Sequence, residues 1–499
     1  MDPVTLQVML GALRAACDEM GVVLVRSAHS ANIKERRDSS TALFDARGQM
    51  VMQAEHIPVH LGAMPFAVDA VRAEEQRPGD AWILNDPYRG GTHLPDITMV
   101  SPIFAAGELA GFAASRAHHA DVGGPFPGSM PAGSRTLEEE GVVIPPTRLV
   151  AEGRLDEELL EGLVSRMRNP GQRRADLRAQ LAANRTGEER LRELVDRNGR
   201  ATLDEAMAET LDYAERRTRA RIAEMEDGER ETTDLLEAAD GDLELRLRAS
   251  VRGDSIELDF SGSAPQHEGN LNCPLAVTLS ACYFALRVLT DPDVPPCAGA
   301  YRPLEVIAPE GTLLNARPPA AVVAGNVETS SRVADLVLAA FGRALGQGTM
   351  NNLTLGNDGF TYYETLGGGQ GACPDADGPS AVHVAMSNTL NTPIEALELE
   401  FPLRAVEYSL RRGSGGAGRF RGGDGVVREL EALEPMRFSL LTERRRHAPP
   451  GADGGEPGAP GRNLLNGEPL PPKASGDLEQ GDRLRIETPG GGGEGEPPG

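Results

Sequence analysis

Hydrophobic and polar residues follow two kinds of spacing along this chain, one typical of helices and one typical of strands. The first segment has helical spacing. Apolar residues from Leu6 to Met20 recur at intervals that place them on one helical face. Asp2 or Thr5 is a candidate N-cap for this segment. The pattern predicts an amphipathic opening helix over residues 3–25, whose ordinary role is packing or docking.

Two segments that follow have the period of strands joined by tight turns. Residues 35–45 alternate, break at 46–48 and resume at 49–53. Residues 97–104 and 109–117 flank a four-residue, glycine-containing connection typical of a hairpin. If that hairpin closes there, residues whose numbers sum to roughly 213 face each other across an antiparallel ladder. Pro95 would then lie opposite His118, and Asp96 opposite Ala117.

From residue 156 to about residue 227 the composition shifts to Leu, Arg, Glu and Ala, which predicts a module of four helices. The expected helices cover 159–167, 174–184, a third beginning near 187, and 202–225. The arginine-dense faces of this module suit a phosphorylated or carboxylate ligand. Because acids are as numerous there, ion pairs within the helices are the alternative.

Strand patterning returns over residues 232–262, and a buried helix is expected over 276–289. Gly325 then begins a turn that predicts Thr329 or Ser330 as the N-cap of a helix reaching about Leu345. Free N–H groups at such a helix start suit an anion, although an ordinary capped helix has the same pattern. By composition, residues 488–499 predict a disordered tail.

Together these patterns predict an α+β, multi-domain protein with mixed and antiparallel sheets and an inserted helical module. At 499 residues the chain exceeds one ordinary core. The expected division is an N-terminal α+β domain carrying the second hairpin (1–150), the helical module (151–228), a central α+β domain (229–430) and a C-terminal β-rich segment with a glycine-rich tail (431–499).

Charge and cysteine usage narrow the function classes. The net charge of −25 disfavours nucleic acid and anionic membranes as partners, because phosphate would be repelled. The five cysteines are scattered without a C-x-x-C pair, so neither a disulfide framework nor a zinc ribbon is indicated. The chain shows no signal-peptide pattern and no run of eighteen apolar residues. We therefore expect a cytoplasmic protein in a reduced compartment.

The second hairpin carries the strongest candidate chemistry. It returns His118 beside the loop that contains His93 and Asp96. Two imidazoles and a carboxylate at a strand end, with Gly-Gly on both sides, suit an open site for Mn, Fe or Zn with positions left for water or substrate. The alternative is that these histidines only satisfy turns in a polar loop.

Other polar residues are candidates for the same site. Adjacent strand residues point to opposite faces, so only one of His118 and His119 can join the cluster, and the other would support a ligand or contact substrate. Asp121 is a possible fourth ligand or an orienter of an imidazole. Glu139 or Glu140, in a run of three glutamates, would reach a metal or activate water, although such runs usually form a solvated face.

Asp38 and Ser39 begin the first hairpin and are polar enough to line a site, although capping a turn is equally consistent with them. Histidines at positions 56 and 60 follow, so six of the nine histidines lie within the first 119 residues. Histidine-based chemistry therefore belongs to the N-terminal portion. The glycine-rich loops at 367–371 and 413–425 lack the elements of a Walker motif, so no P-loop ATP site is expected.

Several motifs in order resemble those of the hydantoinase B/oxoprolinase family. The most specific are Asn85-Asp-Pro-Tyr-Arg-Gly-Gly-Thr-His-Leu-Pro-Asp96 and Ala117-His-His-Ala-Asp-Val-Gly-Gly124. Further matching segments lie at 38–45, 56–62, 259–262, 325–331, 421–429 and 488–493. The last of these argues against the disordered tail that composition predicts. Glu494 departs from the family pattern, which has an aromatic residue and a glycine there.

The resemblance implies a division of labour between two subunits. A hydantoinase A-type ATPase subunit would use ATP to phosphorylate a small cyclic amide, and this chain would complete ring opening within a hetero-oligomer. In related carboxylases the metal ligands fall where His93, Asp96 and His118 stand here. We expect the divalent ion to polarise the amide carbon or supply hydroxide, with proton transfer by His119, Asp121 or Glu140.

Within the resembling motifs, five residues are candidates for substrate contacts: Asp38, Ser39, Asn326, Glu328 and Thr329. The resemblance leaves three functions open. The first is the B subunit of an ATP-dependent cyclic-amide hydrolase of hydantoinase or 5-oxoprolinase type. The second is the catalytic subunit of an ATP-dependent ketone carboxylase of acetone or acetophenone type, although those subunits are generally longer. The third is a scaffold that only docks the ATPase.

Overall fold

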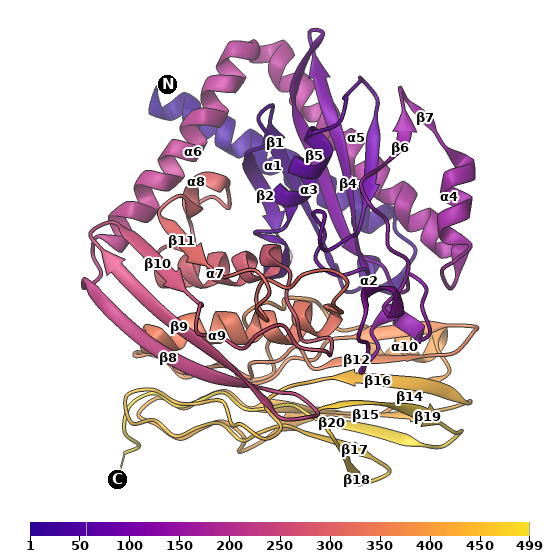
Figure 1. Ribbon diagram of the computed structural model, residues 1–499, viewed down its shortest axis with the longest axis vertical. Helices are drawn as coiled ribbons and strands as arrows, with labels where there is room; N and C mark the ends of the chain where they lie inside the picture. Colours follow the sequence, from indigo (N-terminus) through magenta and orange to yellow (C-terminus); the bar gives the residue numbers. More distant parts are fainter. Residues whose placement is uncertain (56, 499) are drawn as a thin grey trace.

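The alternating segments of the first 155 residues form one seven-stranded sheet. A computed structural model describes residues 1–55 and 57–498 of the chain (Figure 1). The strand order is β2-β1-β5-β4-β3-β6-β7, and every neighbouring pair is antiparallel. The strands are β1 (Ser39–Asp45), β2 (Met50–Glu55), β3 (Ala81–Leu84), β4 (Asp96–Ala105), β5 (Glu108–His118), β6 (Thr147–Ala151) and β7 (Arg154–Leu155).

Both expected hairpins form, but the register of the second differs by one residue. Next to the turn, Phe104 faces Leu109 as predicted. A β-bulge follows, because Ile103 faces Gly111 and leaves Ala110 without a partner. Beyond the bulge the ladder is shifted, so the predicted pairing of Asp96 with Ala117 is wrong. Asp96 instead lies directly opposite His118.

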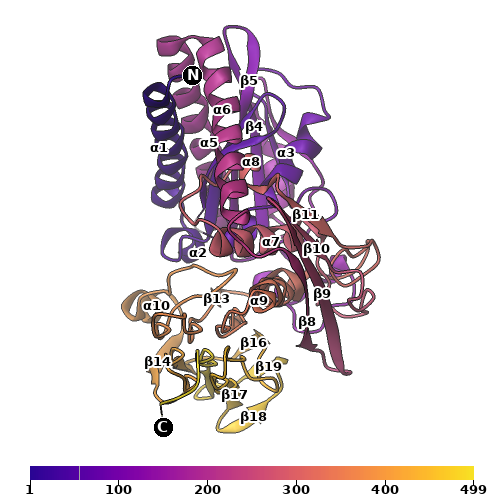
Figure 2. The ribbon, with the colours of Figure 1, turned by 90° about the vertical axis from the view of Figure 1, so that its left-hand side faces the viewer.

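The opening helix forms as predicted and covers one face of this sheet. Helix α1 (Pro3–Ser27) begins after Asp2, whose Oδ1 accepts hydrogen bonds from the backbone N–H groups of Val4 and Thr5. Its buried residues run from Leu6 to Leu24 along one side. Figure 2 shows α1 beside α5 (Pro170–Asn198) and α6 (Arg200–Ile222), with the sheet behind them.

The helical module has three helices in place of the four predicted. Helix α4 (Glu157–Val164) is the first, and α5 then continues without a break through the expected boundary near residue 187. The Thr186 hydroxyl donates to the Ala182 carbonyl and so stays within the helix. A Cβ on Gly187 would lie 2.5 Å from the sulfur of Met20. This glycine therefore marks the close crossing of α1 and α5 rather than a new helix.

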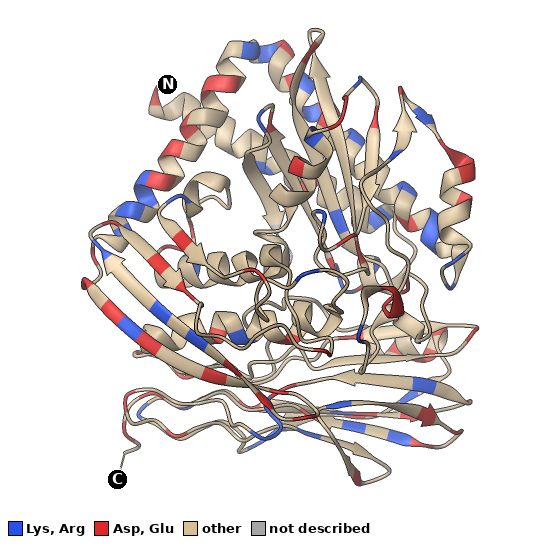
Figure 3. Ribbon diagram, viewed as in Figure 1, with Lys and Arg blue, Asp and Glu red and all other residues tan. Residues whose placement is uncertain are grey.

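The arginines of the module are paired with acids both within their own helix and on neighbouring elements. Arg174 and Arg178 of α5 bind Glu161 and Glu157 of α4, and Arg173 is buried against Asp176. Figure 3 shows acidic and basic residues interspersed along α6 and along the strands β8 (Gly228–Glu237) and β9 (Asp242–Arg252). The ion pairs of Arg174 with Glu161 and of Arg178 with Glu157 tie α4 to α5. The expected pairs within single helices are therefore present, and pairs between elements stand beside them.

Three further sheets follow, which makes the protein α+β with mixed and antiparallel sheets, as predicted. Strand orders are β11-β10-β9-β8, β13-β12-β16-β19 and β14-β15-β20-β17-β18, and β10 with β11 is a parallel pair. Their strands are β8 (Gly228–Glu237), β9 (Asp242–Arg252), β10 (Ser255–Asp259), β11 (Leu304–Ile307), β12 (Asn352–Gly356), β13 (Thr361–Glu364), β14 (Leu403–Arg411), β15 (Gly425–Ala432), β16 (Met436–Leu441), β17 (Arg462–Leu465), β18 (Glu468–Leu470), β19 (Lys473–Leu478) and β20 (Arg483–Glu487).

Two central helices separate the seven-stranded sheet from the two C-terminal sheets. They are α7 (Leu275–Leu289), which matches the predicted buried helix, and α9 (Ser330–Ala340) (Figure 1). None of the helices in the described ranges is long and apolar enough to cross a membrane. The shorter elements are α2 (Ala31–Lys34), α3 (Met64–Arg72), α8 (Ala298–Tyr301), α10 (Ile394–Glu400), the 3₁₀ turns η1 (Pro58–His60), η2 (Pro127–Ser129) and η3 (Leu137–Glu139), and the π-helical turn η4 (Gly325–Thr329).

The segment before α9 is helical earlier than the sequence predicts. Because η4 runs directly into α9, neither Thr329 nor Ser330 is an N-cap. The Thr329 hydroxyl instead donates to the Leu271 carbonyl, 2.6 Å away. A Cβ on Gly325 would lie 1.8 Å from the Asn272 carbonyl oxygen, so only glycine lets these backbones pass. The predicted anion site at a free helix start is therefore wrong, and the helix ends at Ala340.

The glycine-rich tail is ordered. The family resemblance implies this order, whereas composition predicts disorder. Residues 488–493 are buried among the other glycine loops, and the Gly491 N–H donates to the Gly423 carbonyl. A Cβ on Gly491 would lie 2.0 Å from the Gln370 carbonyl oxygen. Glu494, where the family pattern is broken, is buried and pairs through its backbone with Phe420. Close backbone packing therefore replaces side-chain packing in this layer.

We expect Gly491→Ala to destabilise the protein, because its methyl group has to displace backbone. The expected loss is roughly 1–3 kcal/mol of unfolding free energy, seen as a lower midpoint in thermal unfolding. Gly162→Ala is the matched control. Apart from its own helix backbone, no described atom lies within 4 Å of the position that a Cβ would take at this exposed glycine of α4, and alanine favours helix. Equal midpoints for the two variants would contradict the packing account.

Candidate metal centre

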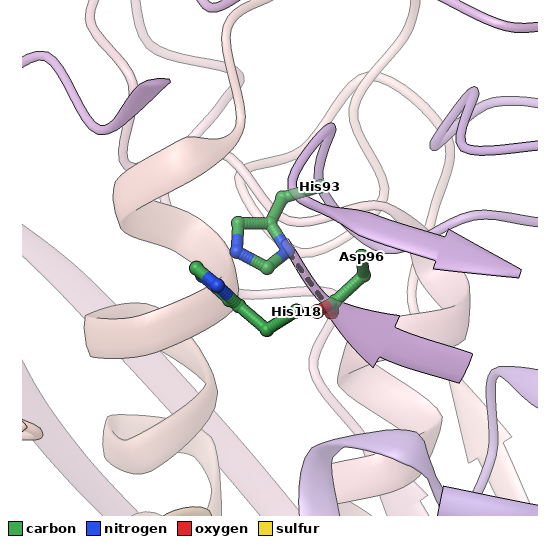
Figure 4. A group of neighbouring side chains, drawn as sticks. All are labelled: His93, Asp96 and His118. Atoms are coloured by element: carbon green, nitrogen blue, oxygen red, sulfur yellow. Dashed lines mark ion pairs between the residues drawn. The ribbon is translucent and has the colours of Figure 1, made fainter. Parts of the chain in front are cut away.

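The paired ends of β4 and β5 bring three potential ligands together. Asp96 and His118 face each other across the ladder, and His93 lies on the loop that leads into β4 (Figure 4). One ligand atom from each residue lies within 4.8 Å of the other two. All three side chains are buried. The hairpin thus builds a compact set of two imidazoles and one carboxylate.

Asp96 is the hub of this cluster. Its Oδ2 lies 3.0 Å from Nδ1 of His93 and 3.4 Å from Nε2 of His60, and it accepts a 2.6 Å hydrogen bond from the Thr92 hydroxyl. Burial by itself would raise the pKa of Asp96, but His93 and His60 outweigh it and hold that pKa well below its usual value. Asp96 is therefore a carboxylate ready to bind a cation.

Several imidazole nitrogens around this carboxylate have no hydrogen-bond partner in the described structure: Nδ1 of His93, Nε2 of His60 and Nε2 of His118. The His93–Asp96 contact is short but lacks hydrogen-bond geometry. Two ligand atoms at right angles, each about 2.1 Å from an ion, stand about 3.0 Å apart. Buried polar atoms without partners are rare in proteins. The donor set fits a divalent metal ion, and the separation of the His93 and Asp96 ligand atoms matches that of two ligands on one ion.

Two asparagines contact the outer nitrogens of the histidines in the cluster. The side-chain amide of Asn32 lies 3.2 Å from Nδ1 of His118, and that of Asn326 lies 3.5 Å from Nε2 of His93. Metal ligation by the inner nitrogen leaves a proton on the outer one, which needs an acceptor. Oδ1 of Asn326 is unpartnered among the described residues, and turning either amide presents its oxygen to the imidazole.

A small enclosed space, here called the inner cavity, adjoins the cluster. Its lining includes Asp38, His60 and Asn326 besides the three ligands. The volume is about 20 Å³, which is room for roughly one water molecule. The ring of Tyr363 closes it on one side and stacks on His118, with centroids 4.4 Å apart. A cyclic substrate therefore does not fit beside the cluster in this conformation.

Comparison with known proteins decides the family. The hydantoinase B/oxoprolinase family profile matches residues 2–497. The chain belongs to the hydantoinase B/oxoprolinase family. This agrees with the resemblance carried by the motifs around His93 and His118.

Two curated relatives illustrate the breadth of the hydantoinase B/oxoprolinase family. A 5-oxoprolinase of Dictyostelium discoideum is 38% identical over 99% of this chain, which spans 40% of that protein's length. A putative D-/L-hydantoinase B subunit of Pseudomonas sp. is 31% identical over the whole chain and 90% of its own. The chain thus corresponds to under half of the longer relative and to nearly all of the shorter one.

Two solved structures share the fold. The ATP-dependent caprolactamase from Pseudomonas jessenii superposes with a TM-score of 0.93 at 31% identity, covering 99% of this chain and 91% of that one. An acetone carboxylase in its nucleotide-free form gives a TM-score of 0.87 at 19% identity, covering 99% and 76%. At that identity the second likeness shows the fold alone.

Of the five substrate-contact residues expected for this hydantoinase B/oxoprolinase family member, the structure brings two to the inner cavity. Asp38 and Asn326 line it, and burial raises the pKa of Asp38 to about 7. Ser39 is buried beside them, with a hydroxyl that has no partner among the described residues. Glu328 and Thr329 do not line the inner cavity: Glu328 accepts from the Met350 N–H, and Thr329 binds Leu271.

The three residues expected to transfer protons lie away from the inner cavity. His119 points to the opposite face, where its Nε2 lies 2.9 Å from Oε1 of Gln180 on α5. Asp121 accepts from the backbone N–H groups of Gly123, Gly128 and Arg168. These contacts organise loops and place neither side chain against the cluster.

Glu140 has a similar structural environment. Its carboxylate accepts from the Ser134 hydroxyl and from the N–H groups of Val322 and Val323, just before η4. Burial raises its pKa to about 7. It is fully buried, so the expected solvated face does not include it. Glu140 thereby fixes the segment that delivers Asn326 to His93.

Several residues of the site have no role in the sequence prediction. His60 lies in a motif that sequence reasoning singled out, and its Nδ1 lies 2.9 Å from the Ser40 hydroxyl. The histidine at position 56 falls outside the described residues. Asn32 and Tyr363 come from α2 and β13. Nothing local marks them, because only the tertiary fold brings them to His118.

We expect Glu140→Gln to lower stability. The side-chain NH2 group of glutamine would face the hydroxyl and N–H donors that now bind the Glu140 carboxylate. The expected cost is about 1–3 kcal/mol of unfolding free energy. Thermal unfolding beside Glu138→Gln, an exposed neighbour, measures it. Unchanged stability of Glu140→Gln together with abolished turnover would instead support the proton-transfer role predicted from sequence.

Proposed function

We propose that this chain is the B-type subunit of an ATP-dependent cyclic-amide hydrolase that requires a divalent metal ion. One observation carries the proposal: the ligand atoms of His93, Asp96 and His118 converge in a buried site whose imidazole nitrogens have no hydrogen-bond partner among the described residues. The relatives named as a 5-oxoprolinase, a hydantoinase B subunit and a caprolactamase support the reaction class.

The proposed reaction is coupled to hydrolysis of one ATP to ADP and phosphate. One water adds across the ring C–N bond, with its hydroxyl going to the carbonyl carbon and a proton to the ring nitrogen. His93, Asp96 and His118 would hold the ion, for which Mn, Zn and Fe are the candidates. Bound there, the ion supplies Lewis-acid polarisation of a carbonyl or of water. Asn32 and Asn326 orient the two imidazoles through their outer nitrogens.

Asp38 is the group placed to move the proton. Among the described residues that line the inner cavity, it is the one carboxylate besides Asp96. No described residue donates a hydrogen bond to its side chain, so its oxygens are available to a water molecule. Asp38 would take a proton from that water and return it to the ring nitrogen. We assign this role to Asp38 in place of His119, Asp121 and Glu140.

Activation by ATP is proposed for a partner ATPase subunit of hydantoinase A type. Two names support it: the Pseudomonas relative is named as one subunit of a hydantoinase, and the caprolactamase is ATP-dependent. The ketone carboxylase alternative is supported by likeness of fold alone. The hydrolase has the larger support because 31% identity accompanies the caprolactamase superposition.

We expect His118→Ala to lose bound metal, because only His93 and Asp96 remain to hold the ion. Elemental analysis of purified protein should find near-stoichiometric Mn, Zn or Fe in wild type and little in the variant. His29→Ala, at an exposed histidine, is the matched control and should keep its metal. Wild-type protein that stays free of metal after reconstitution would contradict the metal assignment.

With the partner subunit and ATP added, wild type should open cyclic amides without bicarbonate, and His118→Ala should not. Turnover that depends on bicarbonate and consumes a ketone would favour the carboxylase instead. Full activity of His118→Ala would revive the scaffold function.

Two substitutions at Asn32 are expected to affect metal affinity differently. Asn32→Leu removes the acceptor for Nδ1–H of His118 and should weaken metal binding about 10–100-fold. Asn32→Asp keeps an acceptor and should bind metal as tightly as wild type or more tightly. Competition with a chelator of known affinity measures both. Equal losses in the two variants would show that Asn32 only fills space.

A further inference from the structure

A larger cavity, here called the outer cavity, lies on the far side of two residues that contact the His118 ring. Its volume is about 280 Å³. Asn32 and Tyr363 both line it, and these two side chains contact Nδ1 of His118 and the face of its ring. Tyr363 also lines the inner cavity. One aromatic ring and one amide therefore separate the outer cavity from the cluster.

The outer cavity runs from the surface toward that wall. At its mouth Asn169 and Gln172 are half-buried and Glu400 is exposed. At its inner end Asn32 and Tyr363 are only 3% and 2% exposed. A volume of this size is near the lower end for small-molecule sites. The geometry is that of an approach to the cluster from solvent, ending at a wall that Asn32 and Tyr363 form.

The chemistry of the lining selects a class of ligand. Phe360, Tyr362, Tyr363 and Phe401 offer apolar ring faces. Three amide side chains, of Asn32, Asn169 and Gln172, supply donors and acceptors that match the N–H and C=O of a cyclic amide. Glu400 is the single charged residue among the described lining, and no basic side chain is present to bind a carboxylate.

We propose that the outer cavity binds a neutral cyclic amide and presents it to the cluster across Asn32 and Tyr363. This rests on the proposed function and narrows its substrate class to rings without a carboxylate. Entry to the inner cavity requires the Tyr363 ring to leave His118. That ring is held by a 2.5 Å hydrogen bond from its hydroxyl to Oδ1 of Asn352 and by the Arg36 guanidinium 4.6 Å from its centroid.

The first test is direct binding of three probes to the full chain by calorimetry. Hydantoin and caprolactam are neutral, whereas 5-oxoproline carries a carboxylate. We expect the neutral rings to bind at least ten-fold more tightly than 5-oxoproline. Ala31→Phe, at a half-buried residue of the wall, should weaken their binding at least ten-fold by filling the outer cavity.

The matched control places a phenylalanine side chain in a different cavity. Ala182 is a half-buried alanine that lines a separate surface cavity of about 440 Å³ against α5. Ala182→Phe should bind the probes as wild type does. Equal affinity in wild type and Ala31→Phe, tighter binding of 5-oxoproline, or no binding of any neutral ring would overturn the proposal.

A second measurement avoids a bulky substitution. In a Cys373→Ser background, which removes the exposed cysteine, Ala31→Cys gives one thiol at the outer cavity. Saturating caprolactam should slow its labelling by a methanethiosulfonate reagent at least five-fold and leave Ala182→Cys unaffected. Equal labelling of Ala31→Cys with and without caprolactam would contradict occupancy of the outer cavity.

Metal content measured on the same samples separates this inference from the proposed function. If neutral rings do not bind in the outer cavity, wild-type protein still binds metal and still opens rings with ATP. Ala31→Phe then binds the neutral rings as tightly as wild type does. If the proposed function is wrong, the wild-type protein itself does not bind metal or does not open cyclic amides.

Discussion

The cross-strand pair of Asp96 with His118 is the contact on which the site depends. An antiparallel ladder fixes both backbones to each other, so the separation of carboxylate and imidazole is set by the sheet rather than by flexible loops. The β-bulge that leaves Ala110 unpaired decides this pairing. A ladder without it would bring Ala117 opposite Asp96 and shift His118 along the strand. One extra residue far from the cluster therefore determines the ligand geometry.

The rest of the molecule supports this pair from several sides. Helix α5 binds His119 through Gln180, η4 delivers Asn326, β13 delivers Tyr363, and α2 delivers Asn32. Such orientation by outer residues is common around metal ligands and tunes their basicity. It also explains why buried polar residues outside the inner cavity, Glu140 among them, have many backbone partners. They hold the segments that aim the residues of the cluster.

Sequence patterns identified the elements well wherever periodicity or turn chemistry was strong. The opening helix, both hairpins and the buried α7 follow directly from them. The proximity of His93, Asp96 and His118 was also predicted, because hairpin closure is a local property. The register was wrong by one residue, since a bulge leaves little trace in composition. Gly187 and Gly325 were misread as breaks, although both are sites where backbones approach closely.

Other features depend on contacts between segments far apart in the chain. Asn32 and Tyr363 meet at His118 from positions separated by more than three hundred residues, which no local pattern reveals. His119, Asp121 and Glu140 have residue types suited to proton transfer, yet the fold turns them toward backbone and helix partners. Composition also failed for the tail, because glycine favours disorder alone but also permits the tight backbone packing seen there.

Anomalous diffraction from crystals grown with Mn, Zn or Fe shows whether the cluster of His93, Asp96 and His118 binds a metal ion. We expect one strong peak at bonding distance, about 2.0–2.3 Å, from one nitrogen of His93, one oxygen of Asp96 and one nitrogen of His118. We also expect the amide oxygens of Asn32 and Asn326 to face the outer imidazole nitrogens. Well-ordered crystals with no peak there, and His93 still paired to Asp96, would contradict the metal assignment.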